Sequence, residues 1–326
     1  MFAVKVDEPG GSDALKWRKV PDPVVKADEV VIDVAATAVN RADIMQRRGF
    51  YPPPTGASEY LGLECAGTIS AIGPDVNNLA IGDEVCALLA GGGYAEKVAV
   101  PTGTVMPLPQ GVDLMTAGSL AEVACTVWSN LVMVAGLSEG DVVLIHGGSS
   151  GIGTHAIQVA KALGATVAVT AGSSEKLAIC ADLGADICIN YREQDFVEEV
   201  KSATGRHGAN VILDNMGAKY LERNVNTLAP NGRLVVIGLQ GGVAAELNLG
   251  KLLTKRATIH ATSLRSRPLD EKKLICTEVV EHVWPMFESG QVRPIIDTVM
   301  PITEVAAAHD RLEASDHIGK IVLTVS

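Results

Sequence analysis

The chain has 326 residues, of which 47% are hydrophobic and 20% are charged. This length accommodates two domains and this apolar content supports a sizeable core, which excludes a largely disordered protein. The formal net charge of −11 is opposite to the basic face that a general nucleic-acid binder needs. The sequence shows no apolar run of membrane length and no signal-like segment, and its six cysteines are scattered without metal-ligand spacing. We therefore expect a cytoplasmic protein with reduced thiols and without nucleic-acid or membrane partners.

The N-terminal third of the chain predicts a compact, mostly β domain. Strand-like runs at 2–6, 29–36, 63–72 and 83–89 are separated by segments rich in proline and glycine, which disfavour long helices. The character changes at 115–136, which is apolar, nearly free of charge and without proline. We expect helices there.

A repeating strand–helix pattern follows and predicts an α/β fold with a doubly wound parallel sheet. Its first unit is an apolar strand at 142–145, the glycine-rich turn GGSSGIG at 147–153, a helix, and a second strand at 166–170. The remaining elements expected in the sheet are strands at 186–190, 210–214, 233–238 and 257–263 and helices at 195–204 and 220–228. The chain closes with a helix at 270–289, a strand at 295–299, a short helix at 304–314 and a strand at 319–325, and the last strand is expected to return to the N-terminal domain.

The glycine-rich turn predicts a dinucleotide site, because glycines let the backbone approach a pyrophosphate and the helix start offers free N–H groups. The alternative is a plain turn between a strand and a helix. The strand before the turn, the helix after it and the second strand that follows favour the dinucleotide interpretation. His146 ends the first strand and is expected to contribute through its backbone. The other residues expected to bind the cofactor in this region are Gly148, Ser150, Gly151, Ile152 and Gly153 in the turn, with Asn215 and Gly238 at the carboxyl ends of later strands.

The end of the second strand favours NADPH over NADH. An NAD site has an acidic residue there, about twenty residues after the glycine turn, to accept the ribose hydroxyls. The sequence instead has Gly172 and Ser173, which leave room for a 2′-phosphate that Ser173 and Lys176 can bind. Tyr191 follows the third strand on the same side of the sheet. The alternatives are that Ser173 only caps the next helix and that Lys176 is solvated.

Several stretches together resemble a known family. They are 38–43 (AVNRAD), 61–67 (LGLECAG), 81–85 (IGDEV), 91–96 (GGGYAE), 170–173 (TAGS), 231–233 (NGR) and 318–323 (IGKIVL). With the glycine-rich turn, they resemble the zinc-free quinone oxidoreductases of the medium-chain dehydrogenase/reductase superfamily, the zeta-crystallin type. The resemblance implies a Rossmann NADPH-binding domain at 122–264 and a discontinuous, mostly β GroES-like catalytic domain at 1–121 and 265–326.

The resemblance also implies that no metal is bound. In the zinc alcohol dehydrogenases of this superfamily, the ligand positions align with Asn40, Leu63 and Glu122. Leucine cannot bind zinc, and asparagine is a poor ligand beside thiolate or imidazole. Without a Lewis acid, oxidation of an alcohol is difficult, whereas a quinone or an activated alkene accepts hydride readily.

The same resemblance implies a pocket for the nicotinamide and the acceptor. Asn40 would hydrogen-bond an acceptor oxygen or the ribose, or simply end a strand as a structural polar residue. Tyr51 would donate to a reduced carbonyl or pack over the cofactor. Thr126 would bind the carboxamide or only its own helix backbone. The residues implied for this pocket are Asn40, Asp43, Tyr51, Leu63 and Thr126, and the loop at Leu264 and Arg265 is implied to cross the nicotinamide.

The leading hypothesis is a zinc-independent, NADPH-dependent quinone reductase that acts on a small quinone or enone and takes its proton from solvent. An alkenal or enoyl double-bond reductase with the same cofactor and an NADPH-binding protein with little turnover remain alternatives. The resemblance further implies a homodimer, joined at the sheet edges near 229–250. The apolar segment 243–253 is compatible with that interface.

Overall fold

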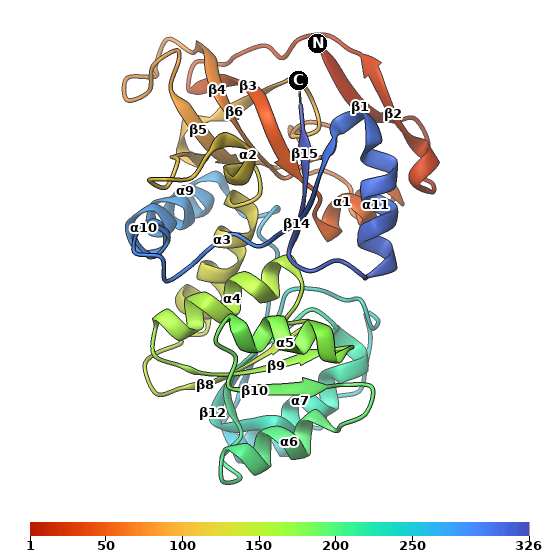
Figure 1. Cartoon of the computed structure of the whole chain (residues 1–326), viewed down its shortest axis with the longest axis vertical. Coiled ribbons are helices and arrows are strands. Elements are labelled where there is room, and N and C mark those ends of the chain that lie inside the picture. The colour runs from red at the N-terminus through yellow and green to blue at the C-terminus, as the bar shows by residue number, and fades with distance from the viewer. Residues whose placement is uncertain (326) are drawn as a thin grey trace. The chain divides into compact units, whose positions relative to one another are not determined.

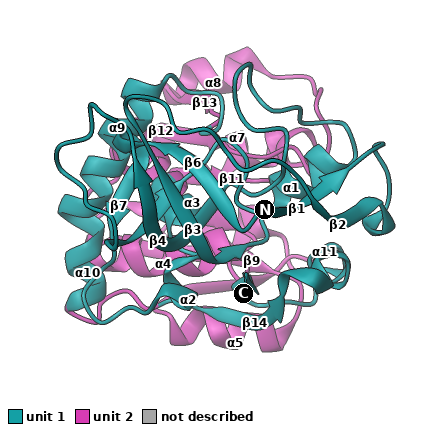
Figure 2. Cartoon of the chain, turned by 90° about the horizontal axis from the view of Figure 1, so that it is seen from above, with its two compact units in different colours: residues 1–125, 264–288, 294–326 teal, residues 126–263, 289–293 magenta. Residues whose placement is uncertain are grey.

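The computed structural model describes residues 1–325, and Ser326 lies outside the described residues. The chain divides into two compact units (Figure 2). Unit 1 comprises residues 1–125, 264–288 and 294–326, and unit 2 comprises residues 126–263 and 289–293. Unit 1 is therefore built from three separate stretches of sequence. The short segment 289–293, between the last two of these stretches, belongs to unit 2.

Unit 1 is mostly β. Its larger sheet has the strand order β14-β15-β3-β4-β5-β7, with β6 also paired to β3, and β1 and β2 form a separate antiparallel pair. Buried aliphatic side chains from these strands form its core, among them Ile32, Ile69 and Leu323. The elements of unit 1 are β1 Phe2–Val6, η1 Ser12–Ala14, β2 Leu15–Lys19, β3 Glu29–Ala38, α1 Arg41–Arg47, β4 Glu64–Ile72, β5 Glu84–Leu88, β6 Lys97–Pro101, η2 Thr102–Thr104, β7 Val105–Pro107, α2 Leu114–Ala117, the start of α3 Ala121–Trp128, α9 Leu269–Glu278, η5 Val279–Val283, α10 Trp284–Glu288, β14 Ile296–Pro301, η6 Ile302–Glu304, α11 Val305–Ala314 and β15 Lys320–Thr324.

Unit 2 is a parallel sheet of six strands in the order β10-β9-β8-β11-β12-β13, with helices between successive strands (Figure 1). This order reverses between β8 and β11, and parallel sheets of this kind bind ligands outside the carboxyl ends of the two strands at such a reversal. The predicted fold class is confirmed. The elements of unit 2 are the end of α3, η3 Ser129–Val134, β8 Val142–His146, α4 Gly151–Ala162, β9 Thr166–Ala171, α5 Ser174–Asp182, β10 Ile187–Asn190, α6 Phe196–Ala203, β11 Ala209–Asp214, η4 Gly217–Tyr220, α7 Leu221–Thr227, β12 Leu228–Val236, α8 Leu249–Lys255 and β13 Thr258–Ala261.

The last strand, β15, returns to the N-terminal part of the chain. It pairs antiparallel with β3, with Val322 opposite Ala38, and parallel with β14 (Figure 1). Its apolar residues 321–323 are fully buried, so they complete the core of unit 1. The first residue of the strand, Lys320, is therefore fixed inside the unit.

Some elements differ from the expectation. β12 begins at Leu228, five residues before the predicted start, because Leu228 already pairs with Ala209 of β11. Strands β2, β6 and β7 were not predicted, because they lie in the segments rich in proline and glycine between the expected strands. No helix within residues 1–325 is long and apolar enough to cross a membrane.

Candidate functional site

The glycine-rich turn of unit 2 joins β8 to α4 at the carboxyl edge of the sheet. Ser150 is the N-cap of α4, and its Oγ accepts a hydrogen bond from the Gly153 N–H at 3.1 Å. A Cβ at Gly153 would lie 2.3 Å from the Gly147 carbonyl oxygen, so only glycine fits there. The amides of Gly151 and Ile152 lie in the first helical turn, where N–H groups lack an acceptor within the helix. This turn therefore offers donors to an anion.

Residues from two further loops meet this turn. A Cβ built on Gly147 would lie 2.9 Å from Asn215 Nδ2, and one built on Gly238 would lie 2.9 Å from the Asn215 carbonyl oxygen. Asn215 Oδ1 is buried and has no hydrogen-bond partner among the described residues. A buried acceptor without a partner is costly in a folded protein, which indicates that a ligand supplies the missing donor. These residues fit a bound dinucleotide.

The end of β9 lacks an acidic residue. Ser173 Oγ caps α5 by accepting from the Lys176 N–H at 3.4 Å, so its capping alternative is present in the structure. A Cβ at Gly172 would lie 2.7 Å from the Tyr191 hydroxyl and 3.3 Å from Arg192 Nε. The structure thus brings Gly172, Tyr191 and Arg192 together, and this group of donors suits a phosphate better than a pair of ribose hydroxyls.

The His146 side chain is part of the core of unit 2. Its Nε2 donates to Asn224 Oδ1 at 2.7 Å, and its Nδ1 lies 3.1 Å from Thr170 Oγ1. Its ring packs edge-on against Phe196 and Tyr220, with centroids 4.8 Å apart in both pairs. Burial lowers the pKa of this imidazole to about 4, so it is neutral at physiological pH. Any role in binding a cofactor falls to its backbone.

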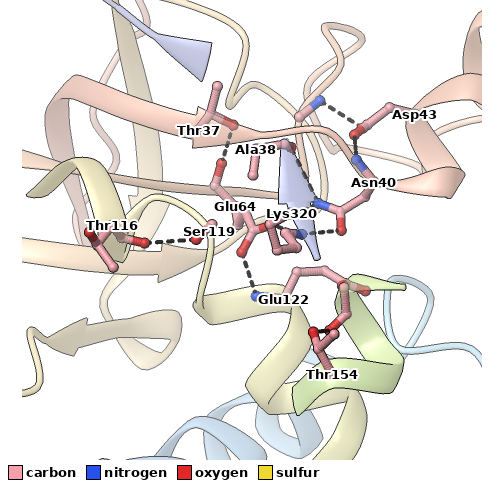
Figure 3. Close-up of polar contacts among 12 residues, drawn as sticks. Thr37, Ala38, Asn40, Asp43, Glu64, Thr116, Ser119, Glu122, Thr154 and Lys320 are labelled. Atoms are coloured by element: carbon pink, nitrogen blue, oxygen red, sulfur yellow. Dashed lines mark hydrogen bonds and ion pairs between the residues drawn. The ribbon is translucent and has the colours of Figure 1, made fainter. Parts of the chain in front are cut away.

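In unit 1, Asn40 belongs to a buried polar network with Glu64 and Lys320 (Figure 3). Lys320 Nζ lies 2.7 Å from both Asn40 Oδ1 and Glu64 Oε1. Asn40 Nδ2 donates to Glu64 Oε1 at 2.8 Å and to the Ala38 carbonyl at 3.3 Å. The second carboxylate oxygen, Glu64 Oε2, accepts from the Glu122 N–H at 3.0 Å. Both amide hydrogens of Asn40 are therefore already donated within unit 1.

Asp43 is fully buried next to this network. Its carboxylate accepts from the Asn40 N–H at 2.8 Å, the Gly62 N–H at 3.1 Å and the Tyr94 hydroxyl at 3.1 Å. Burial raises the pKa of Asp43 to about 6, against the opposing effect of these three donors. Asp43 therefore holds the turn after β3 against the loop that carries Gly62.

The Tyr94 hydroxyl continues this chain of contacts to His309 of α11. It lies 3.2 Å from His309 Nε2, and His309 Nδ1 lies 3.3 Å from Arg47 Nη1. Since arginine can only donate, His309 accepts at Nδ1 and donates from Nε2. Burial first, and then the Arg47 charge, lowers the pKa of His309 to about 3. His309 is a neutral structural link.

Tyr51 and Arg265 lie together in unit 1. The Arg265 guanidinium donates to the Tyr51 carbonyl at 3.2 Å and lies 5.3 Å from the centre of the Tyr51 ring. It also donates to the Ala90 carbonyl and to Gln46 Oε1. The side chain of Arg265 thus fastens the loop that presents Tyr51. Leu264 precedes it in unit 1, and Leu63 is buried at the start of β4.

Thr126 lies within α3, where the first residues of unit 2 begin. Its side chain is largely buried, and its carbonyl accepts hydrogen bonds from the side chains of Ser129 and Asn130. The expected role beside a carboxamide stays a prediction.

Sequence reasoning did not assign site roles to Lys320, Tyr94 or His309. Lys320 stands in the stretch 318–323 that carries the family resemblance, so that motif was the available signal. Tyr94 likewise lies in the stretch 91–96. His309 is one histidine on a helix, and its contact with Tyr94, 215 positions away, leaves no trace in the sequence pattern.

The residues at the aligned zinc positions do not fit a metal. Leu63 has no donor atom, and the Asn40 and Glu64 oxygens already hold the Lys320 ammonium, whose charge repels a cation. Within residues 1–325, no cluster of three or more histidine, cysteine, aspartate or glutamate side chains has an arrangement suited to a metal ion. The chemistry of these donors therefore disfavours zinc.

Comparisons with known proteins agree with this architecture. Residues 26–110 match the alcohol dehydrogenase GroES-like domain, and residues 151–280 match the zinc-binding dehydrogenase model. The chain is 32% identical to the quinone oxidoreductase of Lama guanicoe over 326 residues, covering 99% of this chain and 97% of that protein. It is 29% identical to a phenolphthiocerol/phthiocerol polyketide synthase of Mycobacterium tuberculosis, of whose length it spans only 15%.

Solved structures give the same result. The Escherichia coli quinone oxidoreductase in complex with NADPH has a TM-score of 0.90 and 26% identity, and the match covers 100% of both chains. The CurK enoyl reductase has a TM-score of 0.87 and 28% identity, over 100% of this chain and 99% of that one.

A GroES-like unit joined in one chain to a six-stranded Rossmann sheet defines the medium-chain dehydrogenase/reductase class of oxidoreductases. Within this class, the chain belongs to the zinc-free quinone oxidoreductase family. The family uses NADPH, which confirms the predicted cofactor at the level of the family. The description of the matched family as zinc-binding dehydrogenases does not imply a zinc site in this chain, because the residues at the aligned zinc positions do not suit a metal.

Proposed function

We propose that this protein is an NADPH-dependent quinone reductase that works without zinc. The observation that carries the proposal is the Lys320–Glu64–Asn40 network, because it places an internal ammonium on Asn40, one of the residues aligned with zinc ligands. The unpartnered Asn215 Oδ1 beside the glycine-rich turn supports nucleotide binding. The cluster of Gly172, Tyr191 and Arg192 supports a 2′-phosphate on that nucleotide.

When bound, NADPH supplies a hydride from C4 of the nicotinamide, which a quinone accepts at its carbonyl or its conjugate position. The protein's task is to bind, orient and exclude water. Leu63 is a buried apolar residue at one of the aligned zinc positions. We assign to the Tyr51 hydroxyl a hydrogen bond to the acceptor oxygen, and Arg265 holds the Tyr51 loop in place. Because Asn40 has both amide hydrogens donated to Glu64 and Ala38, we assign it a positioning role and take the proton from solvent.

The first experiment follows NADPH oxidation with a simple ortho- or para-quinone, with and without EDTA. We expect turnover that EDTA does not change. Loss of activity with EDTA and recovery with zinc would show that the interpretation of Asn40 and Leu63 is wrong. Tight NADPH binding without turnover on any acceptor would favour the low-turnover binding protein instead.

The second experiment tests the 2′-phosphate site. Lys176→Ala should raise the KM for NADPH much more than the KM for NADH, because only NADPH carries the phosphate. Lys251→Ala, on the exposed helix α8 of the same unit, should leave both constants unchanged. Equal effects of Lys176→Ala on both cofactors would contradict this assignment.

An enoyl or alkenal double-bond reductase is the second candidate, favoured by the similarity to the CurK enoyl reductase. A panel of enones and quinones with deuterium-labelled NADPH separates the two activities. Deuterium on the β-carbon of a saturated product, at a kcat/KM above that of the quinones, would favour the second candidate.

We also propose that the protein forms a homodimer through the β13 edge of unit 2. This strand ends the sheet, and Val243, Leu249 and Leu253 between β12 and β13 are strongly exposed. Light scattering of the purified protein should give twice the chain mass. A monomer mass at micromolar concentration would reject this interface.

We further propose a cytoplasmic location. All six cysteines are free thiols, as expected of a protein kept in a reducing compartment. Cell fractionation tests this location, and recovery of the protein in an oxidising compartment would contradict it.

A further inference from the structure

Unit 1 contains a cavity of about 580 Å³ whose lining includes Arg265 but neither Tyr51 nor Asn40. Its walls come from Met1, the segment 21–29, the loop at 54–60, the segment 88–92, strand β6 with Thr104, and the segment 265–272. All of these stretches belong to unit 1. The volume falls in the range of sites for small organic molecules. Val24 and Leu269 are the wall residues whose large apolar side chains are exposed.

Arg265 lines this cavity although its side chain is almost completely buried, with 5% exposed. Its three hydrogen bonds go to the Ala90 carbonyl, the Tyr51 carbonyl and Gln46 Oε1, all of which are neutral acceptors. These bonds use three of its five N–H groups. No carboxylate of residues 1–325 forms an ion pair with it, and Asp43 acts on its charge only at longer range. A buried charge without a counter-ion is costly.

Lys272, on α9, adds a second cation to the same cavity. It is half-buried, and in the described part of the chain its ammonium has neither a hydrogen-bond acceptor nor a carboxylate partner. Burial and the charge of Arg265 lower the pKa of Lys272, so the two cations are close enough to repel each other. An anion placed near both would relieve this repulsion.

The other charged groups on the cavity walls are already neutralised. Lys26 pairs with Glu29 at 2.9 Å. Lys97 lies 3.6 Å from Asp33, and Arg267 lies 3.4 Å from Glu271. Asp22 is paired with the amino group of Met1. Arg265 and Lys272 therefore remain as the uncompensated charges of this cavity.

We propose that this cavity binds a small organic acid, with its anionic group held by Arg265 and Lys272 and its apolar body against the exposed side chains of Leu269 and Val24. Guanidinium and ammonium groups bind carboxylates, sulfonates and phosphates through charge-assisted hydrogen bonds. The apolar wall distinguishes such a ligand from an inorganic ion. The site is separate from the glycine-rich turn, which belongs to unit 2.

The test uses 2-naphthoate and its neutral analogue 2-naphthalenemethanol as probes, in calorimetric titrations of the full chain saturated with NADPH. We expect one naphthoate per chain and binding of the alcohol at least about tenfold weaker. Lys272→Gln should weaken naphthoate binding about tenfold, and Lys272→Arg should retain it because the charge is kept. The matched control is Lys273→Gln, since Lys273 is the exposed neighbour on the same helix and does not line the cavity.

Three outcomes would overturn the proposal. The first is equal binding of the acid and the alcohol, and the second is equal effects of Lys272→Gln and Lys273→Gln. The third is that naphthoate binds the NADPH-free protein but does not bind the NADPH-saturated protein. The last outcome would assign the anion to the nucleotide site. Because the readout is binding and not turnover, failure of this proposal and failure of the proposed reductase activity are distinguishable. Thermal unfolding of each variant verifies that it is folded.

Discussion

Lys320 and Glu64 form a buried ion pair, with the Nζ and Oε1 atoms 2.7 Å apart, between two strands that are 256 positions apart in the sequence. The Glu64 side chain is fully buried and that of Lys320 is 8% exposed. Asn40 binds both partners, so it lies in a fixed orientation at the end of β3. The pair is a buried ion pair of the GroES-like unit, and it orients Asn40.

Lys320→Met should destabilise the protein by about 3–5 kcal/mol, because it leaves the Glu64 carboxylate buried without its cation. Adding Glu64→Gln should recover part of this loss, since the second change removes the unpaired charge. Urea unfolding measures both. Lys5→Met breaks an exposed pair with Asp7 and should cost no more than about 1 kcal/mol. A loss as small as that for Lys320→Met would contradict the structural role of the pair.

Asn215→Leu should separate cofactor binding from folding. The substitution removes the unpartnered Oδ1, so the stability of the cofactor-free protein should stay equal or increase slightly. The rise in Tm caused by NADPH should shrink, because binding energy is converted into stability by mass action. Thermal scans with and without NADPH give both quantities. An undiminished NADPH shift would show that Asn215 does not contact the cofactor.

Gly172→Asp should shift cofactor preference toward NADH. The new carboxylate would stand at the end of β9, where it can accept the ribose hydroxyls and repels a 2′-phosphate. The nearest atom to the new Cβ belongs to the half-exposed Tyr191 side chain, which can move aside. We expect the NADPH-to-NADH ratio of kcat/KM to fall about tenfold or more. Ala181→Asp, on the exposed face of α5, carries the same charge and should leave the ratio unchanged.

The His309 imidazole should make stability depend on pH. Its pKa falls from 6.5 to about 3 on folding, so the unfolded chain binds more protons between these values. Its contribution is therefore complete above pH 6.5 and is lost as the pH falls toward 3. Asp43 acts in the opposite sense, because burial raises its pKa from 3.8 to about 6 and its contribution is lost as the pH rises through 6.

Comparison of variants isolates the histidine. Tm should decline less steeply from pH 7 to pH 5 in His309→Gln than in the unmodified protein, since glutamine can still accept from Arg47 and donate to Tyr94. His207→Gln removes an exposed histidine and should retain the original slope. Parallel curves for His309→Gln and the unmodified protein would contradict the neutral, buried state of His309.

The parallel sheet of unit 2 could be predicted because its signals are local. Each strand is a short apolar run, and the glycine-rich turn marks the first crossover. The start of β12 could not, since Leu228 was expected to end a helix and Asn231-Gly232 to form a turn. These residues join a strand only through the pairing of Leu228 with Ala209. Tertiary pairing decided that boundary.

The candidate site was predictable where the chemistry lies in one segment. The turn from Ser150 to Gly153 and the absence of an acid at Gly172 are of this kind. The partners of Asn40 were not predictable, because an isolated lysine in a sequence is ordinarily solvent-exposed and only the pairing of β15 with β3 buries Lys320. Arg265 is similar, since its contacts with Gln46 and Tyr51 join segments more than 200 positions apart.

The return of β15 to β3 has a consequence for synthesis of the protein. All of unit 2 lies before residue 294, so its sheet can close while β15 is still within the ribosome. Unit 1 has to wait, with β3 lacking its neighbour and the Glu64 carboxylate lacking its cation. Unit 2 is therefore expected to mature first on the ribosome, and unit 1 to become protease-resistant only after Lys320 emerges.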